Sequence, residues 1–66
     1  MHYLVRVYDD GDTVIRRVKK VEVQTITLSF DTPEDLKEEL IDYGHDEHNI
    51  DVAIDSMLKT DDWVEV

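Results

Sequence analysis

The chain has 66 residues, enough for one small domain, and its 17 Asp and Glu against 7 Lys and Arg give a formal net charge of -10. Its content of 41% hydrophobic residues, with β-branched and aromatic types among them, excludes a disordered acidic tail. Cysteine is absent, which excludes disulfides and thiolate metal sites. No apolar run approaches the roughly 20 residues of a membrane span, and we expect no signal peptide. We therefore expect one acidic cytoplasmic domain over residues 1–66.

The first 18 residues predict a β-hairpin. Apolar and polar residues alternate over residues 2–8, which is the period of a strand. The turn segment 9–12 contains Asp10-Gly11, a pair that favours a tight turn because glycine accepts a positive φ. Alternation then resumes over residues 13–18, which predicts the second strand.

A third apolar run covers residues 21–30 and predicts further sheet. Its phase changes in the middle, so a β-bulge or a sharp bend is expected near Gln24-Thr25. The connection Lys19-Lys20 has no glycine or proline. Two interpretations therefore stay open: a separate third strand, or one long bent strand that continues from residues 13–18.

The second half of the chain predicts helix. Thr32 has the side chain of an N-cap, Pro33 suits the first helical position, and Asp35 stands where a capping acid is found. Gly44 suits the position after the helix end. The expected apolar stripe is Leu36, Leu40 and Tyr43, with Ile41 beside it.

A second helix is predicted from about Asp46 to Lys59. A competing interpretation makes residues 50–54 a short strand, because apolar residues also alternate there. Length favours the helix, since the apolar pattern continues beyond residue 54. The residues at helical spacing are Ile50, Ala53, Ile54, Met57 and Leu58.

The segment Trp63–Val66 predicts a closing strand, after a turn at Asp61-Asp62. The expected fold is therefore α+β: a small antiparallel sheet made of a β-hairpin, a bent third strand and a C-terminal strand, covered on one face by two helices. The element order is β-β-(β)-α-α-β. Trp63, Tyr3 and Tyr8 are expected to pack in the core and at its edge.

Charge is distributed unevenly along the chain. Residues 1–30 hold four acids and five bases, a net charge of +1, whereas residues 31–66 hold thirteen acids and two bases, a net charge of -11. Acids needed only for solubility could lie anywhere, so this asymmetry points to an acidic surface on the two predicted helices.

The carboxylates of these helices recur at i, i+4 spacing. Like charges so placed destabilise a helix by roughly 0.2–0.5 kcal/mol per pair. Each step of four residues rises about 6 Å, a spacing that suits a basic groove built for the phosphates of nucleic acid. Two other interpretations assign the acidic surface no binding function: it is a solvated face that aids solubility, or an adaptation to high salt. The predicted partner-binding residues are Glu34, Glu38, Glu39, Asp42, Glu47, Asp51 and Asp55.

Other chemistry has little support. His45 and His48 form the one cluster that resembles a metal site, yet no third histidine is near in sequence, so no metal or other cofactor is expected. There is no glycine-rich phosphate loop and no cysteine nucleophile, so we do not expect an enzyme. The basic cluster Arg16, Arg17, Lys19 and Lys20 is expected to pair with the acidic helices, within the chain or across a dimer.

The predicted function is that of a small acidic, non-enzymatic inhibitor. In size and charge the chain is similar to phage and mobile-element proteins that block host defence, including anti-CRISPR and anti-restriction proteins. This likeness implies a partner protein with a basic nucleic-acid-binding groove, and no direct contact with nucleic acid or membrane. The alternative is a small protein-interaction module or subunit whose acidity is incidental. Such a module could form a homodimer through an edge strand.

Overall fold

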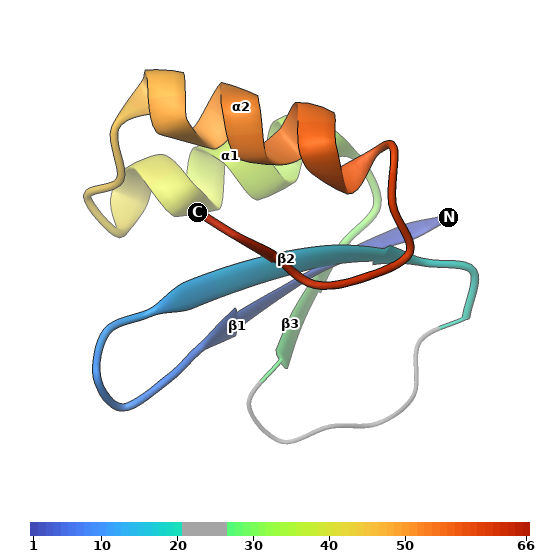
Figure 1. The fold of residues 1–66 in the computed structure, drawn as a ribbon, viewed down its shortest axis with the longest axis horizontal. Helices are drawn as coiled ribbons and strands as arrows, with labels where there is room; N and C mark the ends of the chain where they lie inside the picture. The colour runs from blue at the N-terminus through green and yellow to red at the C-terminus, as the bar shows by residue number, and fades with distance from the viewer. Residues whose placement is uncertain (21–26) are drawn as a thin grey trace.

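The computed structural model describes residues 1–20 and 27–66, and their arrangement is the predicted α+β fold (Figure 1). The bulge expected near Gln24-Thr25 lies outside the described residues. In chain order the elements are β1 (His2–Val7), β2 (Thr13–Val18), β3 (Thr27–Phe30), α1 (Pro33–Asp42), α2 (Glu47–Met57) and β4 (Val64–Glu65).

The four described strands form one antiparallel sheet in the order β3-β1-β2-β4. Val5 of β1 lies opposite Ile15 of β2 on one side and opposite Leu28 of β3 on the other. Because β1 lies between β2 and β3, these two cannot be one continuous strand, and that interpretation is wrong. Ile15 in turn lies opposite Val64, which joins β4 to the hairpin.

The β1–β2 hairpin is closed by the predicted turn. The backbone N–H of Tyr8 donates to the carbonyl of Asp12 over 2.8 Å, and that of Gly11 donates to the carbonyl of Tyr8 over 2.9 Å. Gly11 has φ +91°, a conformation that side chains with a Cβ rarely adopt. The carboxylate of Asp10 accepts from the N–H of Asp12 at 3.0 Å, a local bond that stabilises the turn.

Both helices begin at side-chain caps. Thr32 has extended backbone geometry, and its hydroxyl accepts from the N–H of Asp35 at 3.2 Å, with Pro33 in the first helical position. Asp46 caps α2 in the same way, because its carboxylate accepts from the N–H of Asn49 at 3.4 Å. Residues 50–54 therefore lie inside a capped helix, and the competing strand interpretation is wrong.

The end of α1 is the glycine-terminated motif that the sequence predicts. Gly44 has φ +92°, and its N–H donates to the carbonyl of Ile41 at 2.9 Å. The N–H of His45 donates to the carbonyl of Leu40 at 3.2 Å. These two bonds are the pair of a Schellman motif, which satisfies carbonyls that the helix leaves unpaired.

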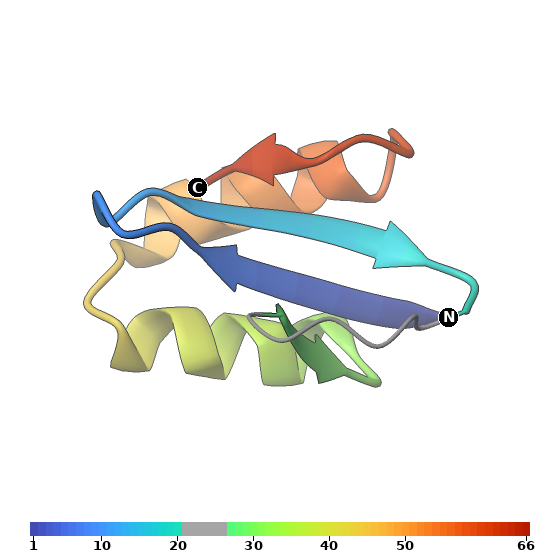
Figure 2. The same ribbon diagram turned by 90° about the horizontal axis from the view of Figure 1, so that it is seen from below.

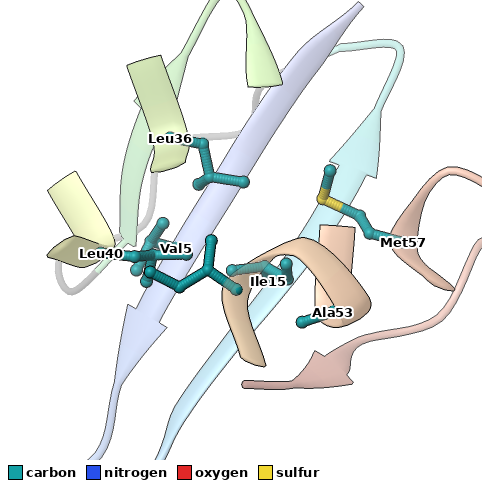
Figure 3. Packing of buried hydrophobic residues seen from close by; sticks show 7 residues of the cluster. Val5, Ile15, Leu36, Leu40, Ala53 and Met57 are labelled. Carbon is teal, nitrogen blue, oxygen red and sulfur yellow. The ribbon is translucent and has the colours of Figure 1, made fainter. Parts of the chain in front are cut away.

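Both helices cover the same face of the sheet, α1 on the side of β3 and α2 on the side of β4 (Figures 1 and 2). Their apolar stripes meet alternate residues of the strands to form the core (Figure 3). Leu40 is fully buried, and Ile54 is partly buried against the same cluster, as predicted. The buried cluster consists of Val5, Ile15, Leu36, Leu40, Ile50, Ala53 and Met57.

The aromatic residues divide between the two faces of the sheet. Tyr3 packs against the core. Tyr8 is 44% exposed, so the expectation that it packs in the core or at its edge is wrong; its backbone instead closes the hairpin turn through Asp12 and Gly11. Trp63 is half-buried, and the guanidinium carbon of Arg6 lies 5.1 Å from the centre of its ring. Arg6 is next to buried Val5 in a strand, so this stack lies on the face away from the helices.

Replacement of Leu40 by alanine tests the core. Because Leu40 is fully buried, the change should lower the free energy of unfolding by about 2–5 kcal/mol. The matched control is Ile41→Ala, at a side chain that is 45% exposed and should lose much less. Urea denaturation followed by circular dichroism measures both. Equal losses for the two variants would mean that the rotation of α1 is different.

Candidate functional site

The candidate site is the outer surface of the helical layer. Leu36 and Leu40 of α1 and Ile50 of α2 are buried against the sheet, and this fixes the rotation of each helix. The carboxylates between these positions then lie on the outside. Of the seven predicted residues, Glu39 is half-buried and the others are exposed: Glu34, Glu38, Asp42, Glu47, Asp51 and Asp55.

The α2 carboxylates are paired with lysines. The Nζ of Lys37, on α1, lies 2.8 Å from Oδ1 of Asp51 and 3.1 Å from Oε1 of Glu47. Just beyond the end of α2, Lys59 places its Nζ 2.9 Å from Oδ2 of Asp55. All three α2 members of the predicted site are therefore partly neutralised.

Lys37 joins the two helices, a role that the sequence interpretation did not assign to it. Its side chain is only 28% exposed, and the hydrogen bonds that its ammonium group donates to Asp51 and then to Glu47 raise the pKa of this group above the ordinary value of 10.5. The charge of Lys37 is thus shared between two carboxylates of the other helix. One sequence signal could have revealed this role, because Lys37 is the single basic residue within residues 33–42.

The three carboxylates Glu34, Glu38 and Asp42, here called the α1 row, are different. Each is exposed, and within residues 1–20 and 27–66 none of them forms an ion pair. Their spacing of four residues sets successive carboxylates about 6 Å apart along the helix axis. The structure thus separates the predicted site into an unpaired α1 row and a lysine-paired α2 row.

Glu39 lies on another flank of α1. It is two residues from Lys37, about 200° around the helix, and so lies on the side away from α2. Tyr43 is one turn further along this flank. Desolvation raises the pKa of the Tyr43 hydroxyl above 10.0, and the charge of Glu39 and a hydrogen bond to it add to the rise.

The basic cluster does not pair with the acidic helices as expected. The Nη2 of Arg17 lies 3.6 Å from Oδ1 of Asp61, and its Nε donates to the carbonyl of Thr60 at 3.2 Å. Both partners belong to the turn between α2 and β4. No ion pair in the described parts of the chain connects residues 16–20 to α1 or α2, so the pairing expected within the chain is wrong.

His45 and His48, the two histidines that resemble a metal site in the sequence, contact different parts of the structure. Nε2 of His45 is 3.1 Å from the hydroxyl oxygen of Thr13, a residue that is 3% exposed. His48 is exposed and lines a hollow between α2 and β4. Over residues 1–20 and 27–66 the structure contains no group of three or more His, Asp or Glu side chains placed to hold a metal ion.

Comparisons of the chain with protein-family models, with curated proteins and with solved structures found no match. Within the described ranges, neither helix has the length and apolar character needed to cross a membrane. The interpretation of the site therefore depends on its own geometry and charge.

Salt should stabilise the protein at pH 7. Repulsion between like charges one helical turn apart costs roughly 0.2–0.5 kcal/mol per pair, and salt screens exposed charges beyond about 8–10 Å. Glu38 belongs to two such pairs in the α1 row, so Glu38→Gln should raise the melting temperature and weaken its salt dependence. The control is Glu65→Gln on β4, which removes the same single negative charge outside the α1 row. A melting temperature that falls with added NaCl would contradict this expectation.

Alkaline pH should destabilise the fold through Lys37 and Tyr43. Both groups have a raised pKa when folded, so the folded state holds these protons more tightly than the unfolded state. Their stabilisation is complete below the unfolded pKa values and is lost as pH rises through the folded ones. The melting temperature should therefore fall from about pH 9 to about pH 12.

Two variants isolate this effect. Lys37→Arg keeps a positive charge that does not titrate in this range, and Tyr43→Phe removes the phenol. The double variant should lose less stability over the same pH interval than the original chain. Identical pH profiles would show that other groups cause the loss.

Proposed function

We propose that this protein is a small acidic, non-enzymatic inhibitor that binds the basic groove of a nucleic-acid-handling protein. The observation that carries the proposal is the α1 row of exposed carboxylates, which has no ion pair among the described residues. The proposed contact is with protein alone, in the cytoplasm, where such a target would meet nucleic acid.

The geometry of the row supports this proposal. Successive carboxylates rise about 6 Å along α1. The phosphates of one nucleic-acid strand rise about 3.4 Å each along the axis, and lie farther apart than this when the distance is measured around the groove. A groove whose Lys and Arg side chains neutralise several phosphates can therefore meet the row with the same side chains. Docking would release counterions from both surfaces, as phosphate binding does.

The paired α2 residues have a secondary part in this proposal. Glu47, Asp51 and Asp55 already have lysine partners, so an incoming cation gains less from them than from the α1 row. Lys37 shares its charge with the α2 carboxylates Glu47 and Asp51, and forms no ion pair with the α1 row among the described residues. We place the main contact on Glu34, Glu38 and Asp42, with Glu39 on the neighbouring flank.

Charge reversal tests the proposal. The variant Glu34→Lys/Glu38→Lys/Asp42→Lys reverses the α1 row, and its target binding should fall below detection. The matched control reverses three exposed turn acids: Asp9→Lys/Asp12→Lys/Asp62→Lys. Both variants change the net charge by the same amount. A difference in target binding between them therefore shows that the location of the carboxylates matters, and not the net charge alone.

The measurement is capture of the target from a host lysate on the immobilised protein. Recovery should fall steeply as NaCl rises from about 50 mM to about 200 mM, and duplex DNA or RNA should compete with it. The control variant should retain the target. Recovery of a partner that ignores salt, nucleic acid and the α1 row would contradict mimicry and favour the interaction-module alternative.

A further inference from the structure

The two edges of the described sheet differ in the charge beside them. The β3 edge lies under α1, whose flank away from α2 carries Asp35 and Glu39. The β4 edge lies under α2, and that flank carries Asn49 and Ser56 instead. In a chain of net charge -10, this side of the helical layer presents no helix carboxylate to a neighbour.

A hollow of about 350 Å³ lies between α2 and β4. Val52 at its rim is 54% exposed, although valine is an apolar residue. Val64 and Val66 form its floor and are only partly buried. Small side chains let another helix approach α2 closely here. The lining residues are His48, Asn49, Val52, Ala53, Ser56, Val64, Glu65 and Val66.

The backbone of β4 has hydrogen-bonding groups on its outer side. Val64 lies opposite Ile15, and the N–H of Val66 donates to the carbonyl of Thr13 at 3.0 Å. Because alternate residues of a strand direct their N–H and C=O groups to opposite sides, those of Glu65 face outward. Among the four described strands β4 is an edge, and an edge strand of this kind is a template for pairing.

We propose that a second copy of this chain pairs with it along β4, about a twofold axis. The two sheets would join into one antiparallel sheet, with all helices on the same face. The register that suits the charges places Val64 opposite Val64 of the second copy. Glu65 then lies opposite Trp63 of the second copy, and the two Glu65 carboxylates are not directly opposed.

The spacing of the elements is compatible with this arrangement. Paired strands lie about 4.8 Å apart, and α2 packs on both β2 and β4. A helix above the midline of these two strands would lie about 10 Å from its symmetry mate, the distance at which helices pack. Val52 would then be buried between the two α2 helices, close to the axis.

The distribution of charge favours twofold pairing along β4 over a head-to-tail contact between copies. The α1 row of one copy could instead meet the sheet face that carries Arg6 and Arg16 in the next copy, but such contacts produce open chains and weaken with salt. The β4 contact brings two chains of net charge -10 together through surfaces on which Glu65 is the one acid among the residues that line the hollow. Screening should therefore strengthen it, and the α1 rows stay exposed in both copies.

Single cysteines test the register, because the chain has none of its own. Val64→Cys should form a disulfide-linked dimer under mild oxidation, since directly opposite residues of paired strands lie within disulfide reach. The control is Leu28→Cys, which also lies on the helix-facing side of an edge strand. Linkage of Leu28→Cys in place of Val64→Cys would overturn the proposal.

Sedimentation equilibrium of the complete chain gives the second test. The dimer dissociation constant should fall as NaCl rises from about 50 mM to about 500 mM, where screening is nearly complete. Val52→Lys should raise this constant by about tenfold or more. The control Ile41→Lys makes the same charge change at an exposed residue of α1 and should leave it unchanged.

The remaining outcomes are decisive as well. A chain that stays monomeric at millimolar concentration in high salt would overturn the proposal. A dimer that dissociates as salt rises would indicate the head-to-tail contact. Neither result affects the inhibitor proposal, because that proposal is tested by target capture with α1-row variants.

Discussion

The burial of two apolar helix stripes on one face of a small sheet is the interaction on which the rest of this structure depends. Leu36 and Leu40 from α1 meet Ile50 and Met57 from α2 over Val5 and Ile15 of the hairpin. This contact sets the rotation of both helices. Once it forms, the acidic residues between the apolar positions have no place except the outer surface, because a buried charge without a partner is too costly.

That surface is acidic, yet its two halves are electrostatically different. Lys37 is a single cation shared by Glu47 and Asp51, and it compensates part of the α2 charge while it joins the helices. Ion pairs at a protein surface are worth little individually, so we expect the main effect of Lys37 to be on how charge is distributed over the two helices. It leaves negative potential concentrated on Glu34, Glu38 and Asp42, and this concentration is the basis of the proposed binding to a basic groove.

The acidic residues on the flanks of the helices also influence which edge of the sheet can pair with another chain. Asp35 and Glu39 stand beside the β3 edge, where carboxylates oppose pairing with another acidic chain. On the other side of the helical layer, Ala53 and Ser56 of α2 lie beside the β4 edge, and no carboxylate of that helix lines the hollow there. A pair formed there would carry two α1 rows on one molecule, so a target with two basic grooves could be bound with higher avidity when geometry allows both contacts.

The local features of the fold were predictable from the sequence, because their causes lie within a few residues. The Asp10-Gly11 turn, the caps at Thr32 and Asp46 and the helix end at Gly44 all depend on hydrogen bonds between near neighbours. The α+β class and the acidic outer faces of the helices follow from hydrophobic periodicity and were predicted with them.

Only the tertiary structure decided which distant groups meet. The strand order placed β1 between β2 and β3, and the closeness of the helices gave Lys37 its two partners on α2. The contacts of His45 with Thr13 and of Trp63 with Arg6 are of the same kind. Periodicity determines which face of an element is apolar, but not which neighbour it meets, because strand order and helix placement depend on contacts between residues far apart in the chain.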